Sequence, residues 1–144
     1  MVSGPTITFG FPEQDVLASL GRLTIMSGHL DYILKMTFKS LKGISIVEAL
    51  QHTNKQNGRI LRQRIIELAK EKLVEEEALA ELMGLIDRAW KAAEIRNRFI
   101  HNLWGRKEYS ELLLQNDDLS WSKAPTKEDV DDLTNEISNT LSRP

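Results

Sequence analysis

Three side chains with catalytic potential, Arg96, Asn97 and His101, lie close together in the sequence. A histidine can accept or donate a proton near neutral pH, and an arginine can bind a phosphate and stabilise charge that develops on it. Asn97 can orient either group. Together they suffice for metal-independent RNA cleavage, in which a 2′-hydroxyl attacks the adjacent phosphorus. The single histidine among these three residues lacks a partner for the second proton, which favours a site formed by two subunits.

The segment that carries these residues, roughly 75–104, is predicted to be one long helix. At about 100° per residue its apolar side chains share one broad arc, and Arg96 falls near the middle of that arc. Asn97 and His101 are four residues apart and share a face on its flank. A buried guanidinium is costly unless it is paired. Asp31, in a polar interruption of the first helix, is the expected counter-charge, although the pair could also be purely structural.

The sequence Arg96-Asn97-x-x-x-His101 matches the R-N-x-x-x-H form of the R-x(4–6)-H motif, and the chain resembles the HEPN family of helical bundles from prokaryotic defence and toxin–antitoxin systems. The resemblance covers most of the chain and implies a single domain over residues 1–144. It implies that two protomers bring their Arg96 and His101 together in a cleft at the dimer interface. The implied activity is that of a metal-independent endoribonuclease, in which Asn97 orients the reacting groups and Asp31 fixes Arg96.

The chain departs from the family pattern at two places. Members that pair with a nucleotidyltransferase antitoxin often carry a tyrosine two residues after the histidine, and Leu103 stands there. The segment 106–125 is additional to the minimal bundle. Two alternatives therefore stay open. The chain could be a catalytically inactive HEPN-like module that binds a nucleotide, RNA or a partner protein, or a plain helical bundle in which Arg96 and Asp31 only set packing.

The composition favours an all-α domain, because helix formers dominate and Gly and Pro are few. We expect an antiparallel bundle of four to five helices, since the predicted connections are short. Residues 1–11 are expected to form an extended arm that packs on the bundle. A small β-hairpin is expected within 106–125, around Asn116-Asp117-Asp118. The motif helix is expected to stop at Gly105.

Local signals place the other helices. The first is expected from Pro12 to about Lys42 and ends at Gly43. Capping boxes at Ser45 and Thr126 open a short helix and the closing helix, and a basic amphipathic helix lies between, over about 59–73. The first helix also has a second apolar strip, which either the arm or a second subunit could cover. This strip consists of Ile25, Tyr32 and Met36.

Although the net charge is only −2, basic side chains gather in two groups along the sequence. A surface on which positive and negative charges are separated allows a polyanion to bind on its positive side. We expect RNA contacts from Arg98, Arg106, Lys107, Arg59 and Arg62.

Other features narrow the function. The chain has no cysteine, which excludes disulfides and thiolate chemistry. Its three histidines have no metal-ligand spacing, so we expect neither a metal nor a cofactor. No segment approaches the roughly 18 apolar residues that a membrane span needs, and no signal peptide is evident. The expected location is the cytoplasm. The expected partners are RNA, a second copy of the chain and a cognate antitoxin protein.

Overall fold

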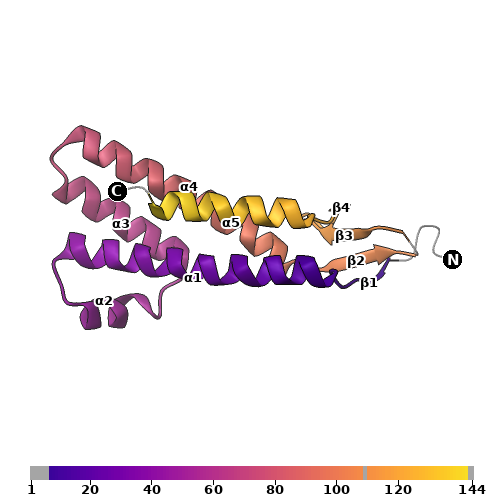
Figure 1. The fold of residues 1–144 in the computed structure, drawn as a ribbon. Helices are drawn as coiled ribbons and strands as arrows, with labels where there is room; N and C mark the ends of the chain where they lie inside the picture. Colours follow the sequence, from indigo (N-terminus) through magenta and orange to yellow (C-terminus); the bar gives the residue numbers. More distant parts are fainter. Residues whose placement is uncertain (1–6, 109, 143–144) are drawn as a thin grey trace. The chain divides into compact units, whose positions relative to one another are not determined.

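The computed structural model describes residues 7–108 and 110–142, and these are mostly helical (Figure 1). The expected bundle helices are all present, but the all-α prediction is only partly right, because a four-stranded antiparallel sheet accompanies them. The helices are α1 (Gln14–Lys42), α2 (Ile46–Thr53), α3 (Gly58–Lys72), α4 (Glu76–His101) and α5 (Lys127–Ser142). The strands are β1 (Ile7–Phe9), β2 (Trp104–Lys107), β3 (Leu112–Gln115) and β4 (Trp121–Lys123).

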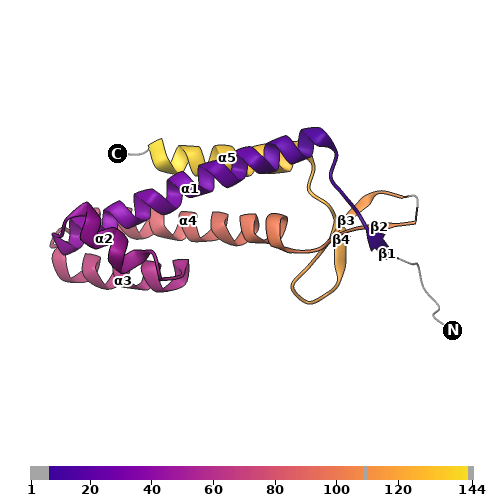
Figure 2. The same ribbon diagram turned by 90° about the horizontal axis from the view of Figure 1, so that it is seen from below.

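The sheet has the strand order β1-β2-β3-β4, and each neighbouring pair is antiparallel. The hairpin expected within 106–125 is confirmed as β3 and β4, which flank the predicted turn. The described part of the arm does not lie along the helices as expected. It forms β1, in which Phe9 pairs with Gly105 of β2. Figure 2 shows the chain passing from the end of α4 into β2, so the sheet continues from the motif helix.

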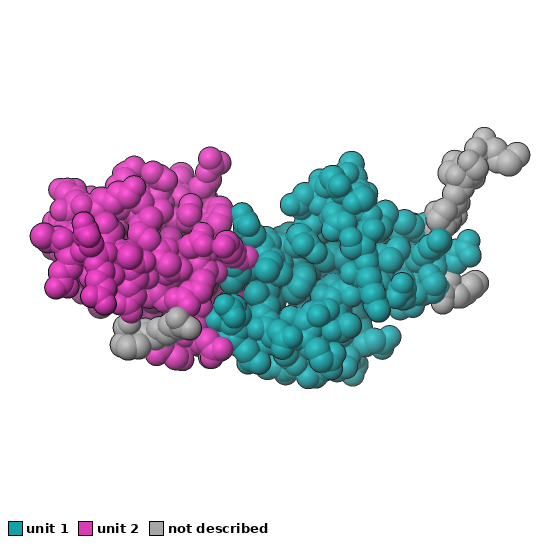
Figure 3. Space-filling model, turned by 90° about the horizontal axis from the view of Figure 1, so that it is seen from above, with its two compact units in different colours: residues 1–25, 92–136 teal, residues 26–91, 137–144 magenta. Residues whose placement is uncertain are grey.

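The contacts divide the chain into two compact units, each of which is described by itself (Figure 3). Unit 1 consists of residues 1–25 and 92–136 and includes the sheet and the C-terminal end of α4. Unit 2 consists of residues 26–91 and 137–144 and includes α2 and α3. All three expected catalytic residues of the Arg-Asn-His motif belong to unit 1.

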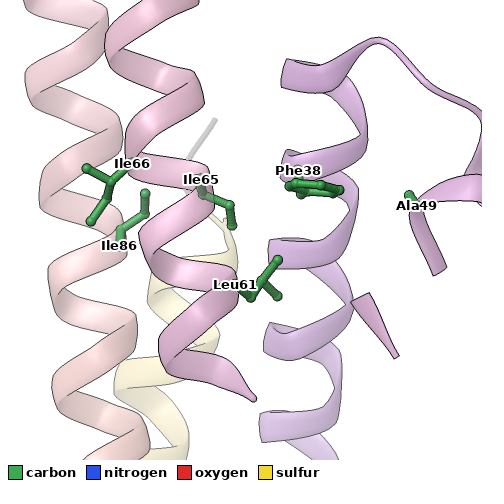
Figure 4. Packing of buried hydrophobic residues seen from close by; sticks show 6 residues of the cluster. All are labelled: Phe38, Ala49, Leu61, Ile65, Ile66 and Ile86. Atoms are coloured by element: carbon green, nitrogen blue, oxygen red, sulfur yellow. The ribbon is translucent and has the colours of Figure 1, made fainter. Parts of the chain in front are cut away.

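The core of unit 2 is an apolar cluster between α1, α2, α3 and α4 (Figure 4). Its buried members are Phe38, Ala49, Leu61, Ile65, Ile66 and Ile86. The four-residue spacing of Leu61 and Ile65 puts both on one face of α3, as the amphipathic pattern predicts.

In unit 1 the most buried apolar side chains include Leu23 of α1, Leu114 of β3 and Val130 of α5. Asp131 of α5 accepts a hydrogen bond from Lys127 at 2.6 Å and lies 3.6 Å from the guanidinium of Arg22 on α1. Hydrogen bonds from Lys127 and Ser19 and the positive charges of Lys127 and Arg22 lower the pKa of Asp131, while the Asp131 carboxylate raises the pKa of Lys127.

The predicted end of α1 and the predicted starts of α2 and α5 are confirmed, whereas α1 begins at Gln14 and not at Pro12. Gly43 has φ +72°, and its N–H donates to Lys39 O at 2.9 Å, as expected of a glycine that ends a helix. Ser45 accepts from the backbone N–H of Glu48. Thr126 and Asp129 exchange hydrogen bonds in the same way at the start of α5.

The second apolar strip of α1 is at least partly uncovered, because Ile25 and Tyr32 are both exposed. The described arm residues 7–9 pair with β2. The alternative, a subunit interface at this strip, stays a prediction. Residues 1–6 of the expected arm and the expected helix end at 143–144 lie outside the described residues. None of the described helices is both long enough and apolar enough to cross a membrane.

Candidate functional site

The motif helix ends earlier than predicted. α4 stops at His101, and the chain becomes strand at Trp104, whereas the sequence pattern placed the end at Gly105. Asn102 still donates its backbone N–H to Arg98 O at 3.2 Å, which completes the last turn. His101 is therefore the last helical residue and not one in mid-helix.

Side-chain hydrogen bonds hold this helix end against the sheet. Asn102 Nδ2 donates to the backbone O of Gln115 at 2.9 Å and to Asp117 Oδ1 at 3.0 Å. The indole N–H of Trp104 donates to Phe99 O at 2.9 Å, which satisfies a carbonyl of the last turn. These bonds stabilise the turn of the chain from α4 into the sheet.

Arg96 is half-buried and its guanidinium is held by the next residue. Arg96 Nε and Nη2 both donate to Asn97 Oδ1, at 3.1 and 2.7 Å. The backbone of Arg96 lies on the same side of α4 as the buried Ala92 and Phe99, which agrees with its predicted place on the apolar arc. The head group is not buried with them, since a long side chain can carry its charge to the edge of an apolar surface.

The bond to Asn97 also determines which face of α4 the guanidinium occupies. Five residues separate Arg96 from His101, so their backbones point about 140° apart around the helix. Asn97 and His101 differ by about 40° and share one face. Because the guanidinium lies against Asn97, it is drawn toward the face that carries His101. Asn97 and His101 are both exposed on this face of α4.

His101 borders an open groove of about 520 Å³ that lies wholly within unit 1. Three segments line the groove: residues 9–12, the α1 residues Leu17, Leu20, Gly21 and Thr24, and residues 99–104. Most of these residues are apolar. A histidine at its rim can reach a ligand that enters from solvent.

Asp31 is an exposed residue of unit 2, whereas Arg96 belongs to unit 1. The expected pairing of the two residues stays a prediction. Because Arg96 is only half-buried, the predicted need for a buried counter-charge is weaker than the sequence pattern suggested.

The five predicted RNA-binding cations divide between the units. Arg98 and Lys107 are exposed in unit 1, and Arg106 there donates through Nη1 to Ser110 O at 2.8 Å. In unit 2, Arg59 is exposed. Arg62 is half-buried, with its guanidinium carbon 5.1 Å from the ring centroid of Trp90, so this cation already stacks on an aromatic ring.

Sequence reasoning did not place Phe9 and Phe11 beside the motif, and it did not identify the hydrogen bonds that Asn102 and Trp104 make at the end of α4. An Asn near the predicted helix end is a recognised stop signal, and it could have located the end of α4. Nothing local indicates that Phe9 lies beside the motif, because the pairing of β1 with β2 joins segments about a hundred residues apart. Among the described residues no group of three or more His, Asp or Glu is placed to hold a metal ion.

No family model matches the chain, and no curated protein or solved structure matches it.

Proposed function

We propose that this chain is a metal-independent endoribonuclease that works as a homodimer, as its resemblance to HEPN domains implies. One observation carries the proposal. Arg96, Asn97 and His101 lie on the last turns of one helix, with the guanidinium held on the side of α4 that carries the histidine. His101 lies at the rim of the groove, and Asn97 and Arg96 lie four and five positions before it on the same helix.

In the proposed reaction His101 takes the proton of a ribose 2′-hydroxyl, and the 2′-oxygen attacks the neighbouring phosphorus. Arg96 stabilises the negative charge on the phosphorane oxygens. The bond between phosphorus and the 5′-oxygen then breaks, and the 5′-oxygen leaves with a proton. The products are a 2′,3′-cyclic phosphate and a 5′-hydroxyl. Asn97 keeps the planar guanidinium in one orientation through a charge-assisted hydrogen bond. A guanidinium surrounded only by water would have no fixed orientation.

The second proton requires a second acid, and each chain supplies one histidine beside Arg96. A second copy that brings its own His101 to the same phosphate completes the pair. We therefore propose that the homodimer is the active form and that Arg98, Arg106 and Lys107 contribute contacts to the RNA backbone. In a toxin or phage-defence setting, a cognate antitoxin would be a further partner. Leu103 replaces the tyrosine on which modification by a nucleotidyltransferase would act.

The decisive experiment is RNA cleavage in the presence of EDTA. His101→Ala should abolish cleavage and leave folding and dimerisation nearly intact, because the side chain is exposed. His52→Ala is the matched control, since His52 is an exposed histidine of α2 in unit 2. Arg96→Ala should lose cleavage and some RNA affinity. Arg96→Lys should not restore it, because an ammonium cannot reproduce the two bonds to one amide oxygen.

Several results would contradict the proposal. A requirement for Mg²⁺, or products with 5′-phosphates, would indicate a different mechanism. Full activity of the His101→Ala protein would point to a contaminating nuclease. RNA binding without cleavage by the wild-type chain would favour a binding module. A monomer at micromolar concentration in sedimentation would remove the argument for a composite site.

A further inference from the structure

The groove beside His101 has two aromatic residues that the proposed reaction does not use. Phe9 and Phe11 both line the groove and are 87% and 74% exposed. Single exposed apolar residues are common on protein surfaces, but two phenylalanines at one groove are a concentrated apolar surface. Gly10 between them donates its N–H to Trp104 O at 3.1 Å, which fixes the backbone that carries both rings.

The lining of this groove carries no negative charge. Of the described residues that line it, none is acidic and His101 alone is titratable, although Asp117, which does not line it, accepts a hydrogen bond from the lining residue Asn102 at 3.0 Å. In the strand register Lys107 lies opposite the first residue of β1, and by the alternation of a strand it is on the same face of the sheet as Phe9. Arg106, opposite Thr8, lies on the other face, where its guanidinium donates to Ser110 O. One cation, Lys107, therefore lies on the face of the sheet that carries Phe9.

We propose that the groove binds an unpaired base of single-stranded RNA next to the scissile phosphate, with Phe9 and Phe11 as the stacking surfaces. Lys107, on the same face of the sheet as Phe9, holds the adjoining backbone, and the neighbouring phosphate lies within reach of His101. This inference rests on the proposed ribonuclease function and specifies its substrate class. Bases that are splayed out of a helix stack on aromatic side chains, whereas the bases of an A-form duplex are hidden from them.

The size of the groove fits this occupant. A volume of about 520 Å³ lies within the range of roughly 300–1,000 Å³ that is usual for small-ligand sites. A second copy of the chain is the competing occupant, since apolar surface also forms subunit interfaces. Lys107 and the lack of acids among the described lining residues favour RNA, because two copies would bring two lysines together with no acid in the lining to pair with them.

The test measures binding separately from cleavage. A short 2′-O-methyl oligouridylate cannot be cleaved by 2′-hydroxyl attack, and its affinity can be followed by fluorescence anisotropy. Phe9→Ala and Phe11→Ala should each weaken binding by about 5- to 100-fold. Phe11→Leu should weaken it nearly as much, because leucine is apolar but has no flat ring, whereas Phe11→Tyr should retain it. Val74→Ala, at a residue that is 95% exposed in unit 2, is the control and should change nothing.

An abasic oligonucleotide with the same backbone completes the test. Wild-type protein should bind it about 5- to 100-fold more weakly than the uridylate, and the Phe9→Ala and Phe11→Ala proteins should hardly distinguish the two probes. Equal binding of both probes by the wild type would overturn the proposal. So would substitutions that alter the sedimentation behaviour and leave RNA binding unchanged, because the groove would then be a subunit interface.

These outcomes separate the two proposals. If the base-dependent binding is found and the wild type does not cleave RNA in EDTA, the groove is an RNA site and the ribonuclease function is wrong. If the wild type cleaves RNA through His101 but cleavage and binding are insensitive to Phe9, Phe11 and the bases, the ribonuclease function stands and the groove proposal fails.

Discussion

Asn102 is the residue whose replacement tests most directly how α4 positions His101. Its side-chain amide donates to Gln115 O at 2.9 Å, in a part-buried position, and to Asp117 Oδ1 at 3.0 Å, in an exposed one. A net contribution of about 1 kcal/mol for the first bond, and less for the solvent-exposed second bond, gives about 1–2 kcal/mol for the pair. Asn102→Ala should therefore lower the melting temperature by about 2–8 °C in a chain of this size.

The functional effect should exceed the loss of stability. Without the amide, the helix end that carries His101 is no longer held to the β3–β4 turn. A displacement of about 1 Å at a reacting group can reduce the rate about 100-fold. We expect kcat for RNA cleavage to fall about 10- to 100-fold at a temperature where the variant is fully folded. KM should change little, because the cations that we propose to bind phosphate are untouched.

Two further variants grade the effect. Asp117→Ala removes only the exposed bond and should cost less than half as much stability as Asn102→Ala. Asn102→Asp replaces the donor by a carboxylate that faces the carbonyl of Gln115 and the carboxylate of Asp117, so it should be the most damaging of the three. Thermal unfolding and steady-state cleavage measure both effects. An unchanged melting temperature in Asn102→Ala would refute the structural role, and a lowered one with unchanged kcat would refute the positioning role.

Three other predictions concern the elements around the site. Gly105→Ala should destabilise the sheet, because the added Cβ would lie 2.8 Å from the Trp121 ring, and urea unfolding should show a lower midpoint. Leu119→Gly should raise the midpoint by the equivalent of about 1 kcal/mol, since Leu119 has φ +72° and is 71% exposed; a lower midpoint would contradict this. Because hydrogen bonds from Lys127 and Ser19 depress the pKa of Asp131 below its ordinary value of 3.8, the stability that its carboxylate contributes is present above that value and is lost as the pH falls through the folded-state pKa. The difference in melting temperature between wild type and Asp131→Asn should accordingly shrink in acid, and a constant difference would exclude this linkage.

The local parts of the fold were predictable from the sequence because their causes are local. The caps at Ser45 and Thr126 and the stop at Gly43 each depend on residues within one turn of the helix. The β3–β4 hairpin was predictable for the same reason. The pairing of β1 with β2 was not, because strands of three and four residues carry little pattern and this pairing joins residue 8 to residue 106.

The end of the motif helix illustrates the limit of periodicity. Leu103 and Trp104 continue the apolar arc of α4 at the helical spacing, so the pattern contains no sign that the helix has ended. What ends it is a set of hydrogen bonds from Asn102 and Trp104, one of them to a residue thirteen positions further on. A competition between helix and sheet of this kind is decided by tertiary partners, which a one-dimensional pattern does not contain.

The orientation of Arg96 has a consequence for how two subunits would share one site. A helical projection places the backbones of Arg96 and His101 about 140° apart on α4. The hydrogen bonds from the guanidinium to Asn97 turn the charge toward the face that carries His101. If the proposed ribonuclease function is right, one chain could present both groups to the same phosphate. The partner's proposed contribution would then be the second proton-transfer group.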